Sequence, residues 1–137
     1  TTLHLANGIY SPETGESFEI VLPEYVNLKG ESMDFTILDA QHTSRVLRIE
    51  NMDNATIENL TITRGYSSNN FSGFGGGVFI NNTNSILFEN VKIIDNFAEA
   101  SGGGIAANFS NICIHIIIMP SVSKKLDSKP NRCIFKQ

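Results

Sequence analysis

Two glycine triplets set in matching surroundings constrain this chain more than any other feature. They lie at 75–77 and 102–104, an offset of 27 (102 − 75), and an alternating apolar run at 85–93 separates them. Self-similarity at such a spacing is typical of a coil of short stacked strands, because each repeat buries its apolar side against its neighbours. Glycine in these turns permits positive φ or close approach of neighbouring backbones. The six glycines to which we assign this structural role are Gly75, Gly76, Gly77, Gly102, Gly103 and Gly104.

A second register supports the repeat. Residues 57–62 match residues 88–93 at an offset of 31 (88 − 57), in the order apolar, Glu, Asn, apolar, polar, Ile. Side chains of a straight strand alternate between two faces, so Ile57 and Ile62 cannot share one face unless the strand bends between them. Asn tolerates the left-handed conformation that a sharp corner needs. We therefore predict corners at Asn59 and Asn90, stacked one above the other; the alternative is chance similarity of two Ile-rich strands.

Composition limits the classes of function. The 137 residues suit a single domain, 41% of them are hydrophobic, and the net charge is −4. This balance disfavours a nucleic-acid partner or an anionic membrane that binds through bulk charge. Cys113 and Cys133 are the only cysteines, and a disulfide and two free thiols are both open. The three histidines are isolated and no zinc spacing occurs, so we expect no metal and no cofactor.

The two ends of the chain differ in pattern. Residues 1–5 lack the pattern of a signal peptide and resemble the middle of a strand, so we expect the chain to begin inside a longer protein. The apolar run at 112–119 is too short to span a bilayer. We divide the chain into 1–111, the repeating turns, and 112–137, an irregular C-terminal cap or a disordered tail.

Several motifs carry a family resemblance. Asn7-Gly8 and Tyr10, followed by residues 26–30 and 36–39, look like the opening turns of pectin-lyase-like right-handed parallel β-helices. Residues 57–62 are similar to the Asn turns of that superfamily. Residues 93–105 resemble the repeat of bacterial polymorphic outer membrane proteins, although those usually carry Phe at the place of Ile93 and two glycines rather than three. The resemblance covers roughly residues 3–111 and implies fold more strongly than function.

The fold that we predict is an all-β, right-handed parallel β-helix of about five turns, a segment of a longer helix. Its runner-up is an antiparallel β-sandwich, in which the strands at 57–62 and 88–93 would pair as a hairpin. The residues that we expect to point inward are Val26, Leu28, Ile37, Val46, Ile57, Leu60, Ile62, Val78, Ile80, Phe88, Val91, Ile93 and Ile105.

The resemblance implies an exported or cell-surface protein, with adhesion or glycan contact as its use. The superfamily also contains polysaccharide lyases, galacturonan hydrolases and pectin esterases, so a fragment of such an enzyme is the alternative. The sequence has no Asp-Asp pair, and Asp95-Asn96 is not the paired carboxylate that glycoside hydrolysis uses. Arg48 and Arg64 could each act as a lone base or as a clamp, but no cluster of carboxylates for calcium accompanies them. We therefore expect a non-catalytic segment.

One surface is a candidate for contact with a polysaccharide or a host glycan. The offset of 31 places Thr61 beside Lys92 and Arg64 beside Asp95 on adjacent turns. Mixed charge along the axis could form hydrogen bonds to a polymer. The plainer alternative is an ordinary solvated face with a weak ion pair.

Overall fold

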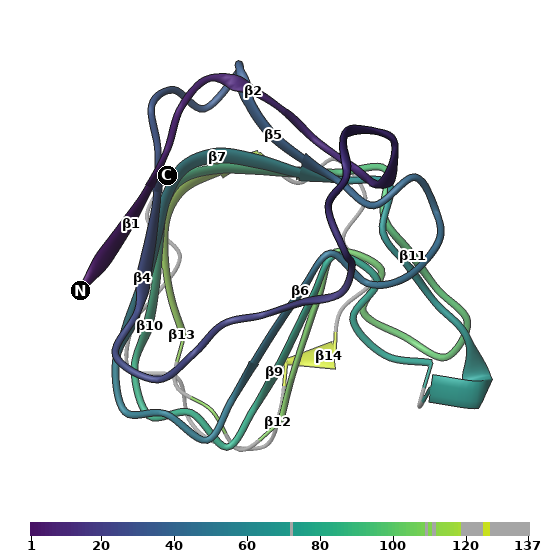
Figure 1. The fold of residues 1–137 in the computed structure, drawn as a ribbon. Coiled ribbons are helices and arrows are strands. Elements are labelled where there is room, and N and C mark those ends of the chain that lie inside the picture. The colour runs from purple at the N-terminus through teal and green to yellow at the C-terminus, as the bar shows by residue number, and fades with distance from the viewer. Residues whose placement is uncertain (72, 109, 111, 119–124, 127–137) are drawn as a thin grey trace.

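The computed structural model shows a coil of parallel strands (Figure 1). It describes residues 1–71, 73–108, 110, 112–118 and 125–126. The strands are β1 (Thr2–Leu5), β2 (Gly8–Tyr10), β3 (Ile20–Val21), β4 (Asn27–Gly30), β5 (Thr36–Asp39), β6 (Leu47–Glu50), β7 (Ala55–Thr63), β8 (Tyr66–Ser67), β9 (Val78–Asn81), β10 (Ile86–Ile94), β11 (Phe97–Ala98), β12 (Ile105–Asn108), β13 (Ile112–Ile118) and β14 (Lys125–Leu126), with short 3-10 helices η1 (Pro12–Thr14) and η2 (Asn69–Phe71).

Strands that follow one another at one-turn intervals lie side by side. One sheet has the order β1-β4-β7-β10-β13, with β2 and β5 continuing it beside β7, and a second has the order β14-β12-β9-β6-β3. Phe88 pairs with Ile57 and Leu28 pairs with Ile57 from the other side, all in parallel. Parallel pairing of β7 with β10 excludes the antiparallel sandwich. The path runs clockwise as it recedes from the viewer in Figure 1, so the coil is right-handed.

Among the described residues, five stacked strands in each main sheet mark off about four turns, where the sequence suggested about five. The end of the stack also differs, because β13 pairs in register with β10, from Ile86 with Ile112 to Lys92 with Ile118. Stacking thus continues beyond the boundary that we placed at 111, and β14 pairs with β12 through Ala106 and Lys125. Whether the rest of 112–137 forms a cap or a disordered tail lies outside the described residues, as does Cys133.

The Asn corner lets β7 pair with two strands of the preceding turn, β4 before the bend and β5 after it. In β7, Ile57 pairs with Leu28 of β4, whereas Thr61 and Ile62 pair with Ile37 and Leu38 of β5. The bend falls at Asn59, whose φ is 56°, and the equivalent Asn90 has φ 55°. Ile57, Leu60 and Ile62 are all fully buried, which a straight strand could not achieve.

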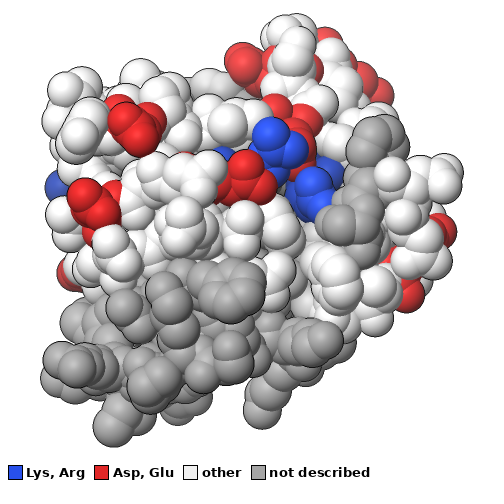
Figure 2. Space-filling view, turned by 90° about the horizontal axis from the view of Figure 1, so that it is seen from below, with Lys and Arg blue, Asp and Glu red and all other residues white. Residues whose placement is uncertain are grey.

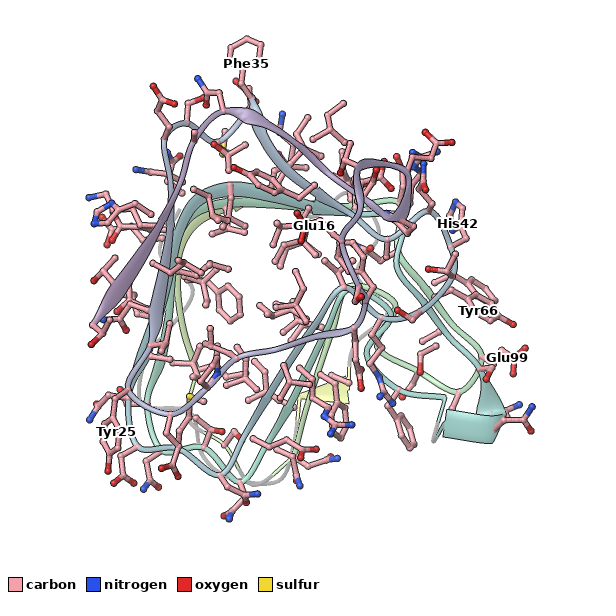
Figure 3. All side chains as sticks on the ribbon, in the orientation of Figure 1. Glu16, Tyr25, Phe35, His42, Tyr66 and Glu99 are labelled. Carbon is pink, nitrogen blue, oxygen red and sulfur yellow. The ribbon has the colours of Figure 1, made fainter. Side chains whose placement is uncertain are left out.

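The interior is filled by side chains that point into the coil (Figure 3), and they are aliphatic apart from Phe88 and partly buried aromatic residues. Eleven of the thirteen residues expected inside are buried, and Val26 packs against the core from a half-buried position. Ile37 was wrongly placed: it is half-buried, and its neighbours Thr36 and Leu38 are buried instead. The cause is the pairing of Leu38 with the inward Ile62, which turns Ile37 outward beside Thr61.

The glycine triplets stack directly. The amide nitrogens of Gly76, Gly77 and Val78 donate to the carbonyl oxygens of Gly102, Gly103 and Gly104 at 3.2, 2.9 and 2.9 Å. A Cβ built on Gly76 would lie 2.2 Å from the carbonyl oxygen of Phe97, so no side chain fits there.

An excursion explains why two offsets, 27 and 31, coexist. The step in sequence number from Ile62 to Val78 is 16 (78 − 62), whereas the step from Ile93 to Ile105 is 12 (105 − 93). The difference between these steps falls in the segment that contains β8 and η2. We call β8, η2 and β11 the arm; it projects sideways from the coil (Figure 1). In the arm β8 pairs with β11, through Tyr66 with Phe97 and Ser67 with Ala98.

Candidate functional site

A groove of about 630 Å³ lies where the arm meets the outer face of the second sheet. Side chains of β6 alternate between the core and the outer face. Leu47 and Ile49 are buried in the core, so Arg48 and Glu50 point outward into the groove. Phe79 is paired with Arg48 one turn later and also faces outward. The arm contributes Tyr66 and Ser67 to the opposite wall. The groove thus combines aromatic rings with charged groups, the usual composition of a ligand site.

Two arginines converge on one carboxylate in the groove. Glu19 accepts from Nη1 of Arg48 at 2.9 Å and from Nη1 of Arg45 at 3.2 Å. Arg45 is buried, donates from Nε to the carbonyl oxygen of Phe74 at 2.9 Å, and lies over the ring of Phe79 at 4.8 Å from its centroid. Arg45 therefore fixes Glu19 and Phe79 in position, and a cation over a ring face stabilises this arrangement.

Arg48 is the more available of the two. About a third of its side chain is exposed, and its Nε is 3.8 Å from Oε1 of Glu50, too far for a hydrogen bond. Seen from below, basic and acidic side chains gather together on this side of the molecule (Figure 2). Arg45 and Arg48 balance Glu19 and Glu50 in charge, so the groove presents donors and acceptors without a net charge.

The stacked aromatic pair on the arm is held by a carboxylate. The rings of Tyr66 and Phe97 lie 5.8 Å apart and nearly parallel, at 11°. The hydroxyl of Tyr66 donates to Glu99, whose other oxygen accepts from the backbone nitrogen of Asn69 at 2.5 Å. The bond to Tyr66 and then that to Asn69 lower the pKa of Glu99, and the same bond to Glu99 raises the pKa of Tyr66. Tyr66 and Glu99 lie together on the outside of the arm (Figure 3).

The four residues that the sequence suggested for ligand contact are partly brought together. Thr61 pairs with Lys92 in the parallel ladder, as the offset of 31 predicted. The hydroxyl of Thr61, however, is buried and donates to the carbonyl oxygen of Met33 at 2.6 Å. Lys92 donates to Asp34 at 2.5 Å, so its charge is already paired.

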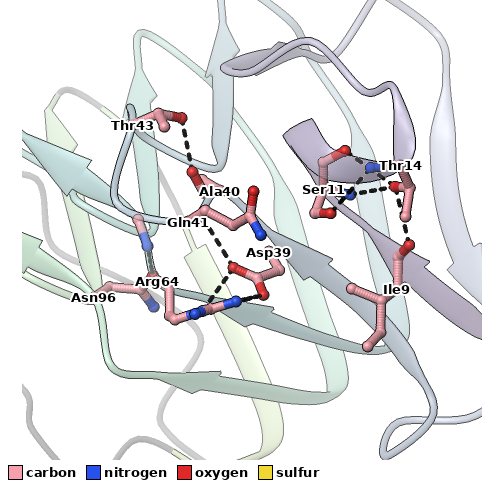
Figure 4. A network of polar contacts seen from close by, with 10 residues as sticks. Ile9, Ser11, Thr14, Asp39, Ala40, Gln41, Thr43, Arg64 and Asn96 are labelled. Atoms are coloured by element: carbon pink, nitrogen blue, oxygen red, sulfur yellow. Dashed lines mark hydrogen bonds and ion pairs between the residues drawn. The ribbon is translucent and has the colours of Figure 1, made fainter.

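Arg64 has a different partner from the one expected. Its guanidinium forms a two-pronged ion pair with Asp39, one turn earlier (Figure 4). Asp95 is exposed and forms no ion pair with the described residues. Asp39 is favoured because its carboxylate, only 8% exposed, already accepts from the backbone nitrogen of Gln41 at the same corner. The hydrogen bond to Asp39 and its charge raise the pKa of Arg64. Arg64 thus forms an ion pair, but with a different acid from the one that the offset of 31 suggested.

Asparagine ladders are more extensive than the sequence interpretation recognised. Nδ2 of Asn90 donates to Oδ1 of Asn59 at 2.9 Å, the stack that we predicted. Nδ2 of Asn82 donates in the same way to Oδ1 of Asn51 at 2.9 Å, on an exposed corner. This second ladder was missed, although the same offset of 31 relates its two residues and could have revealed it. In addition, the side chain of Asn96 accepts from the backbone nitrogen of Gly65 at 2.7 Å and so fastens the base of the arm.

No cluster of three or more His, Cys, Asp or Glu side chains suited to a metal ion occurs among the described residues. Within that part of the chain, no helix is long and apolar enough to cross a membrane.

Comparison with known proteins gives two matches. Residues 1–37 match a family described as a protein of unknown function (DUF1565), which is associated with parallel β-helix proteins. Over 107 residues, 77% of this chain, the sequence is 36% identical to the "Metabotropic glutamate receptor-like protein P" of Dictyostelium discoideum. The chain spans 7% of the length of that relative. No solved structure matches the chain.

Proposed function

We propose that this chain is a non-catalytic β-helix segment of an exported or cell-surface protein, and that it contacts glycans through the groove beside the arm. The observation that carries the proposal is the groove itself, where Arg48, Glu19 and Glu50 share one lining with Phe79 and with Tyr66 of the arm. Sugars offer hydroxyls that both donate and accept, and apolar ring faces that pack on aromatic side chains. A groove with balanced donors and acceptors suits such a ligand.

Two further points support the surface location. The matching relative is named as receptor-like, and a 7% share of its length fits a chain that is one segment of a large protein. Kinship with pectin-lyase-like β-helices and with polymorphic outer membrane repeats is part of the same proposal. The stacked Asn corners and the stacked glycine triplets support that kinship.

The surface of Thr61, Arg64, Lys92 and Asp95 is a second proposed contact region. Asp95 is exposed and forms no ion pair with the described residues, whereas Arg64 and Lys92 are paired within the fold. A ligand here would have to compete with Asp39 and Asp34 for these cations. We therefore place the main contact in the groove and this surface at its periphery.

The test is a glycan array probed with the whole chain and with matched variants. We expect Arg48→Ala and Tyr66→Ala to abolish binding. The control is Lys29→Ala, which removes the surface ion pair of Lys29 with Glu58 on the sheet that does not line the groove, and it should leave binding unchanged. Asp95→Asn reports on the peripheral region. Absence of any glycan binding would leave only a structural role and overturn the proposal.

A cleavage assay on acidic polysaccharides, with and without calcium, addresses the enzyme alternative. We expect no turnover. Turnover that disappears in Arg64→Ala or Arg48→Ala would overturn the non-catalytic assignment and support a fragment of a lyase, hydrolase or esterase.

A further inference from the structure

Five asparagines stand in the pattern Asn-x-Ser/Thr, the acceptor sequence for N-linked glycosylation. Two of these patterns include residues 72 and 109, which lie outside the described part of the chain. The structure distinguishes the other three by whether a folded coil could carry a large oligosaccharide at the asparagine. The five are Asn54, Asn59, Asn70, Asn81 and Asn108.

Asn59 cannot carry a glycan in the folded coil. Its side-chain oxygen accepts from Asn90 within the ladder, and the residue forms the corner at which β7 bends. The hydroxyl of Thr61, which completes the pattern, is buried and bonded to Met33. A sugar on Nδ2 of Asn59 would crowd the stacked corner, because strands of adjacent turns lie only about 4.8 Å apart.

Asn81 is also constrained. It lies on β9 between Glu50 of the turn before and Asn108 of the turn after, with its side chain half-buried. The hydroxyl of Thr83 is fully buried and donates to the carbonyl oxygen of Asn81 at 3.0 Å. Both the amide and the hydroxyl of this acceptor pattern thus belong to a packed edge of the coil.

Asn54 differs from both. It is exposed in the turn between β6 and β7, and its side chain makes no hydrogen bond to the described residues. Ser85 holds the same place in the next turn, because Ala55 pairs with Ile86, and it is exposed as well. In the turn before, Tyr25 holds this place; it is 77% exposed and points away from the coil at this corner (Figure 3). Thr56, which completes the pattern, is only half-buried.

We propose that Asn54 is N-glycosylated, and that Asn59 and Asn81 are unmodified in the folded protein. In this transfer the Nδ2 atom of Asn54 bonds to the anomeric carbon of an oligosaccharide carried on a lipid diphosphate. The bond from that carbon to the diphosphate oxygen breaks, the lipid diphosphate leaves, and Nδ2 loses one proton. The inference rests on the exported location that we propose above, but not on glycan binding by the groove.

The experiment secretes the whole chain from eukaryotic cells behind a cleavable signal peptide. Site occupancy is read by mass spectrometry after enzymatic removal of N-linked glycans, which converts each modified Asn to Asp. We expect Asn54 to be occupied and Asn59 and Asn81 to be unmodified. Asn54→Gln and Thr56→Val should each remove one glycan-sized step in gel mobility, and Thr56→Ser should retain it.

Two results would overturn the inference: an unmodified Asn54 in secreted, protease-resistant protein, or a glycan on Asn59 in that same protein. If a variant is not secreted, translation with microsomes measures attachment at Asn54 directly, and no attachment there again overturns it. Glycan binding should be the same for Asn54→Gln and for the protein that retains Asn54, because Asn54 does not line the groove. Failure of the groove to bind glycans and failure of Asn54 to be glycosylated are therefore separate outcomes.

Discussion

The side-chain amide of Asn90 donates to that of Asn59, its counterpart one turn earlier, at 2.9 Å. Both residues have positive φ, and the two amides stack at the corner where β7 and β10 bend. A partly buried amide that loses its partner is left unsatisfied.

Asn90→Ala should therefore lower the free energy of unfolding by about 1–3 kcal/mol. The matched control is Asn82→Ala, which removes the donor of the exposed Asn51 ladder at a residue with similar positive φ, 49° against 55°. Both variants place alanine in left-handed backbone, so the difference between their urea midpoints isolates the buried amide. Equal losses would show that only backbone strain matters.

Gly76→Ala should destabilise the coil, because its Cβ would lie 2.2 Å from the carbonyl oxygen of Phe97 and the stacked backbones would have to separate. Overpacking of this kind costs about 1–3 kcal/mol. Gly15→Ala is the control: its Cβ meets nothing within 4 Å, although its φ is +99°. An unchanged unfolding midpoint for Gly76→Ala would contradict the close approach of the triplets.

Arg64→Ala should lower the melting temperature more than Lys29→Ala does. Removing Arg64 leaves the mostly buried carboxylate of Asp39 without its cation, whereas the pair of Lys29 and Glu58 is more exposed. Adding Asp39→Asn to Arg64→Ala should restore part of the loss, since the buried charge is then gone. No recovery in the double variant would mean that Asp39 does not depend on Arg64.

The stacking of the Tyr66 ring on the Phe97 ring should weaken at both low and high pH. The lowered pKa of Glu99 means that its bond stabilises the arm above the usual carboxylate range and is lost as the pH falls through that lowered pKa. The raised pKa of Tyr66 means that stabilisation present below the usual tyrosine pKa is lost as the pH rises through the raised one. We expect changes below roughly pH 4 and above roughly pH 10.

The measurement follows NMR signals of the Phe97 ring, which lies 5.8 Å from that of Tyr66. Tyr66→Phe keeps the stack but lacks the hydroxyl, so its Phe97 signals should not titrate with either group. Titration that persists in Tyr66→Phe would assign the effect to another residue.

Much of the fold could be predicted because its determinants are local. The sequence around Asn59 contains the bend, since the change of phase is visible between Ile57 and Ile62 alone. Ile37 was misplaced for the opposite reason: its orientation follows from pairing with Thr61 in the strand of the next turn, and the short run at 36–39 gives no sign of that register.

The groove could not be predicted from local pattern. Alternation in β6 places Arg48 and Glu50 on one outer face, but Glu19 joins them only through the register of β3 with β6. Tyr66 reaches the same groove because the arm folds back after a corner at Arg64, whose φ is 51°. The ion pair of Arg64 with Asp39 was not predicted either, since Asp39 precedes Arg64 by one turn and falls outside the comparison of 57–62 with 88–93.

Parallel stacking at one-turn intervals has a consequence for how the protein is made. Paired positions of neighbouring strands are a full turn apart in sequence, as in the pairing of Ile37 with Thr61 and that of Ile57 with Phe88. No strand can therefore find its partner until another turn has been synthesised. Contacts of such long range form slowly, but each completed turn offers a ready edge for the next. The coil should assemble in the direction of translation, with every new turn templated by the last one to leave the ribosome.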